Sequence, residues 1–356
     1  MRIAAVGRAL PDHYYDQETL LEALKTHWAG RYHNLSRLEK LHRNVQVGGR
    51  HLAVPIDVYQ SLDSWGEANA HWIEVAQDVG ERAIRDGLSQ VGLEPQDVDA
   101  IFFVTVTGVA TPSIDARLCN RLGFRSDIKR TPIFGLGCVA GAAGVARAAD
   151  YVRAFPDHVA VLLSVELCSL TLQPKDLSIP NLIATGLFGD GAAAAVVVGE
   201  ERAQRLGIKG PRVVDTRSVF YPDTEGVMGW DIGDWGFRIV LSAEVPDIAK
   251  GRLSTDVAGF LESKGLSVPD IGVWVCHPGG PKVLLSIEEG LQLPEGALHR
   301  TWRSLEEVGN LSSSSVLFVL ADTLKEHKPT GPNEPGLLLA MGPGFCSELV
   351  LWEWGE

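Results

Sequence analysis

Short runs of apolar and β-branched residues recur along the chain and alternate with stretches of helical periodicity. Continuous apolar runs of this length are typical of strands that are covered on both faces of a sheet. Such runs predict six buried strands, at residues 100–108, 158–167, 192–199, 272–277, 336–342 and 348–354.

Four helices are predicted between these strands. The longest covers residues 71–93, and its apolar positions share one helical stripe: Trp72, Val75, Ala76, Val79 and Ala83. The other three follow Cys138, begin at Pro281 and cover residues 311–327. Strands that alternate with helices in this way predict a layered α/β protein.

The order of these elements repeats along the chain. Each half has a strand, a turn that carries a candidate functional residue, a helix and further strands. The segment "ERAQRLGIKGP" at residues 201–211 loses apolar periodicity between them. We therefore predict an N-terminal half at residues 1–208 and a C-terminal half at residues 209–356. No exact sequence repeat is visible, so the duplication is a prediction about architecture alone.

Composition narrows the class of protein. The 356 residues carry a formal net charge of −13, which argues against a nucleic-acid partner because a bound polyanion needs a basic face. No stretch reaches the ~18 apolar residues of a membrane span, and the N-terminus does not resemble a signal peptide. The cysteines are odd in number and lack a C-x-x-C pair, which predicts reduced thiols in a cytoplasmic protein, without a structural zinc site: Cys119, Cys138, Cys168, Cys276 and Cys346.

The glycine-rich stretch "FGLGCVAGAAG" at residues 134–144 has three interpretations. Cys138 stands at the entrance to a helix, where the helix dipole and free N–H groups favour a thiolate nucleophile. It could instead be a small buried residue, as free cysteine often is. The pattern also fits the G-x-G-x-x-A of a dinucleotide-binding turn, with Glu166 as a ribose-binding acid. A short preceding strand that contains Pro132 weighs against the last interpretation.

His277 and Asn310 are candidate partners of Cys138. The residue before a proline avoids the α region, so His277 in "VWVCHPGG" is expected at the tip of its strand. Asn310 in "GNLSSSS" suits a helix N-cap or a donor to a ligand oxygen. A core histidine and an N-cap asparagine are the alternatives. Together the three residues form a set in which His277 stabilises the thiolate as an ion pair, and His277 and Asn310 donate to one developing oxyanion.

These motifs resemble those of the type III polyketide synthases, the chalcone synthase-like branch of the thiolase superfamily. The resemblance covers nearly the whole chain and includes "GLGCVAGAAG", "HPGG", "GNLSSSSVLF", "LFGDGAAAAVVVG" and "GPGF". It implies a thiolase-like fold of αβαβα layers that is built from two pseudo-duplicated halves. It also implies an acyltransferase that acts on CoA thioesters and uses neither a metal nor another cofactor.

The resemblance implies a mechanism as well. Cys138 attacks an acyl-CoA starter and holds it as a thioester. Malonyl-CoA then loses CO₂, and His277 and Asn310 stabilise the oxygen of the resulting enolate. Phe188 in "LFGDG" matches a gatekeeper whose apolar face promotes the loss of CO₂. A second gatekeeper falls near Phe237, where the spacing departs from the plant pattern.

Further residues are assigned by the same resemblance. The basic segment at residues 31–51 is either a solvated helix face or the CoA phosphate site. The resemblance favours the second role, with Arg37, Lys40, Gly279 and Gly280 at the CoA site and Asn44 in place of a third basic residue. The implied substrate pocket is lined by Thr111, Cys168, Thr171, Phe237 and Ser312.

Two consequences concern the assembly and the starter. A homodimer is implied in which the loop "GVATPSID" reaches the partner's cavity, so that Thr111 acts across the interface. The small pocket residues and the segment at residues 216–242 favour a long fatty acyl starter and alkylpyrone or alkylresorcinol products. A chalcone- or tetrahydroxynaphthalene-type synthase with a small aromatic or malonyl starter is the alternative.

Overall fold

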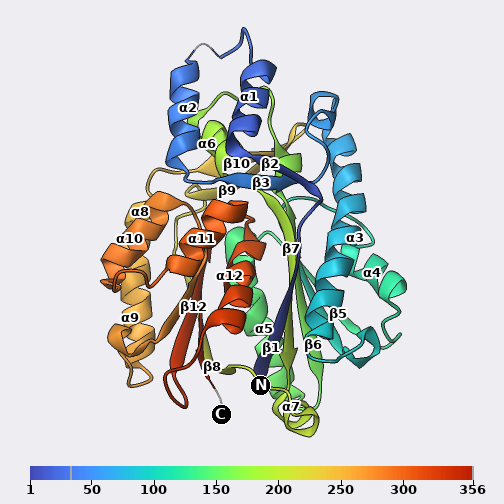
Figure 1. Cartoon of the computed structure of the whole chain (residues 1–356), viewed down its shortest axis with the longest axis vertical. Helices are drawn as coiled ribbons and strands as arrows, with labels where there is room; N and C mark the ends of the chain where they lie inside the picture. Colours follow the sequence, from blue (N-terminus) through green and yellow to red (C-terminus); the bar gives the residue numbers. More distant parts are fainter. Residues whose placement is uncertain (33, 355–356) are drawn as a thin grey trace.

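A computed structural model of the chain describes residues 1–32 and 34–354. Nine strands form one hydrogen-bonded sheet in the order β11-β12-β13-β8-β1-β7-β6-β4-β5 (Figure 1). Their bounds are β1 (Arg2–Ala9), β4 (Ala100–Thr105), β5 (Lys129–Phe134), β6 (Val159–Leu167), β7 (Asp190–Val198), β8 (Arg212–Phe220), β11 (Val273–Cys276), β12 (Pro335–Gly342) and β13 (Cys346–Glu353). Two small sheets pair β2 (His13–Asp16) with β3 (Gly49–Leu52) and β9 (Met228–Gly233) with β10 (Gly236–Leu241).

The large sheet repeats one arrangement of strands. In its N-terminal half, β4 is parallel to β6, while β6 pairs antiparallel with β7 and β7 with β1. In its C-terminal half, β11 is parallel to β12, while β12 pairs antiparallel with β13 and β13 with β8. The two half-sheets join through one residue pair, Arg2 and Arg212. The prediction of two pseudo-duplicated α/β halves is therefore confirmed.

Helices cover both half-sheets and also separate them. The outer face of the N-terminal half-sheet packs on α3 (Trp65–Ser89) and α4 (Ile114–Leu122). The outer face of the C-terminal half-sheet packs on α8 (Val245–Ile248), α9 (Ser254–Glu262), α10 (Pro281–Leu291) and α11 (His299–Val308). Between the half-sheets lie α5 (Ala140–Ala154) and α12 (Ser313–Glu326). This order gives the five αβαβα layers that the resemblance implies.

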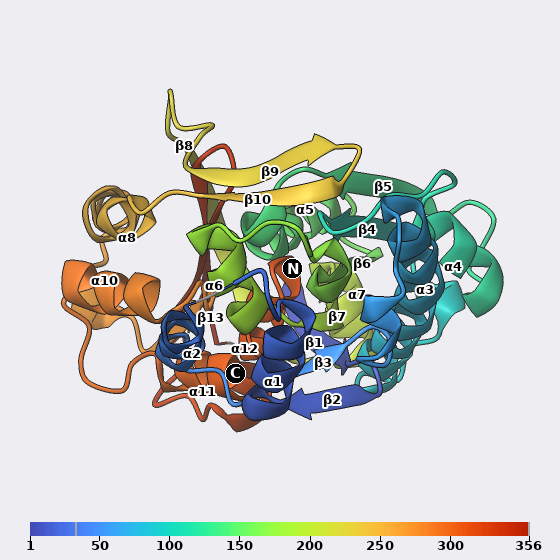
Figure 2. The same ribbon diagram turned by 90° about the horizontal axis from the view of Figure 1, so that it is seen from above.

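A cap of three helices closes one end of the layers, at the top of Figure 1. It consists of α1 (Gln17–His27), α2 (Leu35–Asn44) and α6 (Ile179–Leu187) around a small apolar cluster. Figure 2 shows α6 between α2 and the β9–β10 hairpin. Among residues 1–32 and 34–354, no helix combines the length and the apolar character that a membrane crossing requires.

The predicted elements are confirmed, with some additions. All six predicted strands form, and the four helices appear as α3, α5, α10 and α12. The sequence did not predict β1 and β8, which join the halves, or the β9–β10 hairpin. The predicted boundary at residue 208 lies between α7 (Glu200–Leu206) and β8. That the two halves are separate domains stays a prediction.

The two central helices touch through their backbones. An added Cβ at Gly141 on α5 would lie 2.2 Å from the carbonyl oxygen of Ser313 on α12. An added Cβ at Gly144 would lie 2.3 Å from Leu162 on β6. Glycine at these two positions therefore allows a close approach. Because Cys138 precedes α5 by two residues and Ser313 begins α12, this contact determines how the two helix entrances face each other.

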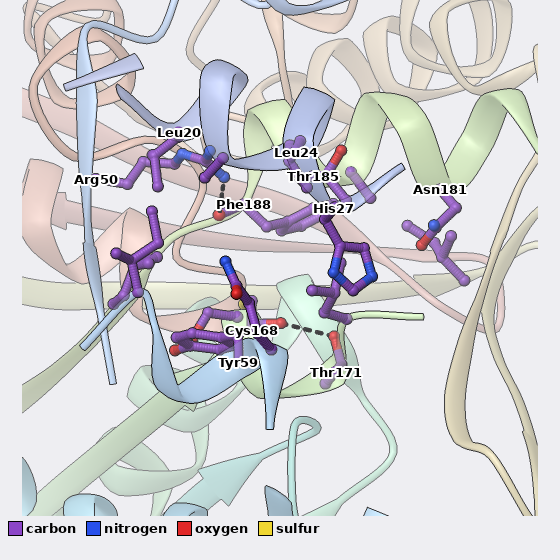
Figure 3. A pocket seen from close by; sticks show the side chains of 18 of the residues that line it. Leu20, Leu24, His27, Arg50, Tyr59, Cys168, Thr171, Asn181, Thr185 and Phe188 are labelled. Carbon is purple, nitrogen blue, oxygen red and sulfur yellow. Dashed lines mark hydrogen bonds between the residues drawn. The ribbon is translucent and has the colours of Figure 1, made fainter. Parts of the chain in front are cut away.

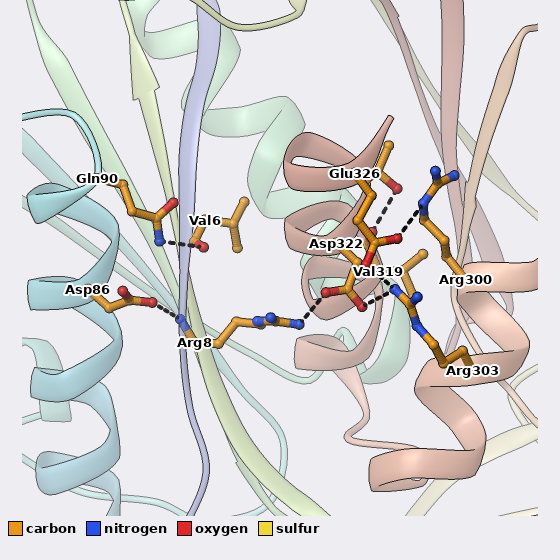
Figure 4. A network of polar contacts seen from close by, with 10 residues as sticks. Val6, Arg8, Asp86, Gln90, Arg300, Arg303, Val319, Asp322 and Glu326 are labelled. Atoms are coloured by element: carbon orange, nitrogen blue, oxygen red, sulfur yellow. Dashed lines mark hydrogen bonds and ion pairs between the residues drawn. The ribbon is translucent and has the colours of Figure 1, made fainter. Parts of the chain in front are cut away.

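An ionic network also holds α12 in place (Figure 4). Arg8 on β1 donates to Asp322 at 2.7 Å, and Arg303 on α11 pairs with Asp322 at 3.2 Å and with Glu326 at 2.6 Å. Arg300 pairs with Glu326 at 3.3 Å. The network therefore ties α12 to α11 on one side and to the strand that joins the half-sheets on the other.

We expect Gly141→Ala to lower the free energy of unfolding by about 1–3 kcal/mol, because its methyl group overpacks the contact between α5 and α12. Gly251→Ala is the matched control, since its Cβ would meet no atom within 4 Å. Thermal and denaturant unfolding of both variants measure the difference. Equal stability of the two variants would contradict the close contact.

Candidate active site

Cys138 lies in a short 3-10 turn, Gly137–Val139, that leads directly into α5. The turn needs glycine, because φ is 98° at Gly135 and 57° at Gly137. A Cβ at Gly137 would also lie 2.6 Å from Pro343. The Cys138 side chain is buried, and its thiol donates to Ser312 Oγ at 3.6 Å. The Cys138 turn thus faces the residue that precedes α12.

Asn310 is fixed by backbone and side-chain contacts. Its backbone N–H donates to the Leu187 carbonyl at 2.9 Å, and its carbonyl accepts from Gly189 at 3.0 Å. These two bonds place Asn310 beside Phe188. The Asn310 Oδ1 atom accepts from the Ser312 N–H at 2.8 Å. This bond orients the amide and leaves Nδ2 as its donor.

The N-cap interpretation of Asn310 is wrong. Helix α12 begins at Ser313, so Ser312 is its N-cap residue. Ser312 has φ of 49°, a left-handed conformation that is rare outside glycine and costs about 1–3 kcal/mol. The Asn310 side chain helps to hold this conformation. Strain of this kind concentrates at functional sites, and here it brings the Ser312 hydroxyl to Cys138.

His277 follows the last residue of β11, as predicted. It is 6% exposed, and neither ring nitrogen has a hydrogen-bond partner among the described residues. The turn after it is tight, because the Gly279 N–H donates to the His277 carbonyl at 2.9 Å and Gly280 has φ of 125°. A Cβ at Gly280 would lie 3.6 Å from Leu187, next to Phe188. The histidine turn therefore packs beside the segment that holds Asn310.

Burial decides the charge of the resting site. It raises the pKa of Cys138 to about 12, and the nearby Glu166 acts in the same direction, while the bond to Ser312 opposes both. Burial lowers the pKa of His277 to about 3. Both groups are neutral near pH 7, since low-dielectric surroundings disfavour each charged form. No hydrogen bond joins Cys138 to His277 within the described chain, so the thiolate–imidazolium pair stays a prediction.

Glu166 does not act as a ribose-binding acid. It is fully buried, and its carboxylate accepts hydrogen bonds from the Val106 N–H at 3.1 Å, from Thr107 Oγ1 at 3.0 Å and from the Ser313 hydroxyl. Burial raises its pKa to about 7. The carboxylate joins the end of β6 to the first turn of α12. The dinucleotide interpretation of the glycine-rich turn is therefore wrong.

A cavity adjoins the site beneath the cap of helices (Figure 3). Phe188, Cys168 and Thr171 line it, so two of the five predicted pocket residues and the predicted gatekeeper meet there. Most of the other side chains around it are apolar: Leu20, Ala23, Leu24, Leu52, Ile56, Leu172, Ala184, Trp230 and Ile239. The rest are polar or charged: His27, Arg50, Tyr59, Gln60, Ser169, Asn181 and Thr185.

The remaining predicted residues lie elsewhere. Phe237 is 2% exposed and packs edge-to-face on Trp65 with ring centroids 5.8 Å apart, while its neighbours on the hairpin, Trp230 and Ile239, reach the cavity. Thr111 is exposed in a surface loop. Ser312 contacts Cys138 but does not line the cavity.

The two predicted CoA-binding side chains, Arg37 and Lys40, are exposed on α2. Within residues 1–32 and 34–354, no ion pair includes either of them. His33, in the same basic segment, lies outside the described residues. Sequence analysis missed His27, Arg50 and Tyr59 as cavity residues. Arg50 stood in the basic segment, but burial at the end of a short strand has no local signal there.

Comparisons with known proteins agree with this geometry. The family models of the chalcone and stilbene synthases match residues 1–201 with the N-terminal domain and residues 212–353 with the C-terminal domain. A 1,3,6,8-tetrahydroxynaphthalene synthase from Streptomyces peucetius subsp. caesius is 50% identical over 99% of this chain and 93% of its own. A putative chalcone synthase from Bacillus subtilis is 40% identical over 99% of this chain and 98% of its own.

Solved structures give the same result. A 1,3,6,8-tetrahydroxynaphthalene synthase from Streptomyces coelicolor, a bacterial type III polyketide synthase, superposes with a TM-score of 0.93 at 30% identity and covers 100% of both chains. The fold and these relatives define a type III polyketide synthase with a thiolase-like fold, an acyltransferase that uses CoA thioesters. The chain belongs to the chalcone and stilbene synthase family.

The neutral resting thiol has a measurable consequence. We expect alkylation of Cys138 by iodoacetamide to be slow at pH 7 and to rise about tenfold per pH unit up to about pH 10, since only the thiolate reacts. Peptide-level mass spectrometry separates Cys138 from the other four cysteines. A rate that is already constant near pH 7 would instead indicate the stabilised ion pair.

Proposed function

We propose that this enzyme primes Cys138 with a small acyl group, preferably malonyl, and extends it with malonyl-CoA to a tetrahydroxynaphthalene-type product. The 50% identity with a 1,3,6,8-tetrahydroxynaphthalene synthase over nearly the whole chain carries this proposal. The long-chain starter favoured by the sequence gains no support from these relatives.

The proposed chemistry follows from the state of each group. Acylation transfers the starter from CoA sulfur to Cys138 and requires the thiol to lose its proton. Malonyl-CoA then binds with its thioester carbonyl toward His277 and Asn310. Because His277 is neutral and has no protein partner, it can donate to the enolate oxygen together with Asn310 Nδ2. Loss of CO₂ leaves the enolate carbon, which attacks the thioester carbonyl on Cys138 and frees the thiolate.

Phe188 is proposed to assist decarboxylation. Its side chain lines the cavity, and its backbone lies beside Asn310. An apolar ring at this place disfavours the malonyl carboxylate relative to neutral CO₂. Arg37 and Lys40 on α2 remain our proposed ligands of the CoA phosphates, with Gly279 and Gly280 near the reacting end. Exposed cations without acidic partners are suited to bind phosphate.

A homodimer is also proposed. Within the part of the chain that the structure describes, the edge strand β5 has no neighbour beyond it in the sheet, and five of its six residues are exposed. Phe134 at its end is 48% exposed, which is unusual for a large apolar side chain. Pairing of β5 with the same strand of a second copy would cover this edge. It would also bring the Thr111 loop toward the partner, as the sequence predicts.

The starter preference can be measured directly. We expect products primed by malonyl-CoA to exceed those primed by C12–C18 acyl-CoA and by coumaroyl-CoA when each competes for labelled malonyl-CoA. Mass spectrometry of the products reads the outcome. Dominant long-chain alkylpyrones would contradict the starter assignment, and the absence of CO₂ release with every starter would contradict the reaction class.

Single variants distinguish the two proposed roles of the site residues, which are acyl loading and malonyl decarboxylation. Cys138→Ala should abolish acyl loading, which intact-protein mass spectrometry detects. Asn310→Ala should keep loading but lower the rate of malonyl decarboxylation by about 10²–10³-fold, the usual cost of one oxyanion donor. Acyl transfer to the Cys138→Ala protein would show that another residue is the nucleophile.

A further inference from the structure

Most polar side chains that line the cavity are already engaged by the protein. Tyr59 and Ser169 share a hydrogen bond, and Thr171 donates to the Cys168 carbonyl at 2.7 Å. Asn181 donates to two backbone carbonyls, those of Gln173 and Asp176. Thr185 donates to the Leu182 carbonyl at 2.9 Å. These groups therefore shape the wall and have limited capacity for a ligand.

Two nitrogens in the same wall are not engaged by the protein in this way. Arg50 Nε and His27 Nε2 are buried and have no hydrogen-bond partner among the described residues. Arg50 comes from β3 and is 4% exposed, while His27 comes from the last turn of α1. Figure 3 shows both side chains directed toward the cavity that Phe188 borders. An unpaired buried polar group is costly, so such a pair indicates a missing ligand.

The charge of Arg50 favours an anion as that ligand. One of its Nη atoms donates to the Phe188 carbonyl at 2.8 Å, but no carboxylate in the described chain lies within ion-pair distance of it. The nearest compensating group, Asp190, is occupied by the Ala53 and Ser169 N–H groups at 2.6 and 2.8 Å. A buried cation without a direct counter-ion is expected to bind a carboxylate strongly.

We propose that Arg50 and His27 bind the carboxylate at the distal end of the acyl chain on Cys138, and so select a dicarboxylic starter such as malonyl. This inference rests on the proposed function and deepens it. The starter carboxylate survives as the far end of the chain while each extension occurs at the thioester. Arg50 and His27 line the same cavity as Phe188, whose backbone lies beside Asn310.

A hydrocarbon end would satisfy neither of these two nitrogens. It would fill the same space but leave both nitrogens without partners and remove their access to water. A carboxylate has two acceptor oxygens and so has the capacity to satisfy both Arg50 Nε and a neutral His27. Burial lowers the pKa of His27, and the nearby Arg31 adds to this effect, so the ring binds as a neutral donor.

The test is a competition within one reaction. Wild type and variants receive malonyl-CoA together with isotopically labelled acetyl-CoA, and mass spectrometry gives the ratio of malonyl-primed to acetyl-primed products. We expect Arg50→Met to lower this ratio roughly tenfold, as for the loss of a hydrogen bond to a charged group, and His27→Leu to lower it about threefold. Arg50→Lys keeps the charge and should fall between wild type and Arg50→Met.

Arg85→Met is the matched control, because it makes the same substitution at an exposed arginine of α3 that does not line the cavity. Its ratio should equal that of wild type. Arg50 also holds the Phe188 carbonyl, so a purely structural role would reduce both products alike and leave the ratio unchanged. That outcome overturns the proposal.

Folding and function have their own controls. Circular dichroism and thermal unfolding check each variant, and His27→Leu with Arg50→Lys decide the question if Arg50→Met does not fold. An unchanged ratio in those two variants would likewise overturn the inference. A wild-type enzyme that forms no polyketide from either starter would instead refute the proposed function itself.

Discussion

The contact between α5 and α12 is the constraint on which the rest of this structure depends. Glycine at position 141 lets the α5 backbone touch the carbonyl oxygen of Ser313, so the two helices approach more closely than side chains permit. Cys138 lies just before one helix, and Asn310 and Ser312 lie just before the other. The two half-sheets enclose this helix pair and carry His277 and Phe188 to the same end. The site is therefore a consequence of how the two halves pack.

The same close packing determines the chemistry of the resting site. A centre built from touching backbones and buried serines excludes water, which disfavours charge on Cys138 and on His277 alike. Neutral hydrogen-bond donors that have no protein partner can stabilise a negative charge that develops on the substrate only during the reaction. Buried Glu166 differs, since its carboxylate is saturated by the strand ends and by α12. Glu166 therefore has a structural role, whereas His277 and Asn310 still have hydrogen-bonding capacity for a substrate.

The sequence predicted those features of the fold and of the site that are encoded by local residue patterns. Apolar runs located the buried strands, and short motifs located Cys138, His277 and Asn310 because glycine, proline and small residues shape their turns. Local pattern failed where distant segments decide the outcome. The contact of Cys138 with Ser312 depends on where α12 begins, and the N-cap alternative for Asn310 is wrong because α12 begins only at Ser313 and the Asn310 side chain accepts from the Ser312 N–H. The join between β1 and β8 was also invisible, since it is one long-range residue pair.

The choice of starter shows the same limit most clearly. Small residues such as Cys168 and Thr171 suggested room for a long chain, yet they form only one side of the cavity. The opposite side comes from α1 and β3, which lie more than a hundred residues away in the sequence. There, burial turns Arg50 from one member of a basic segment into an isolated cation facing a cavity. Our proposal therefore places the selection of the starter in that wall, which exists only once the cap has folded over the two halves.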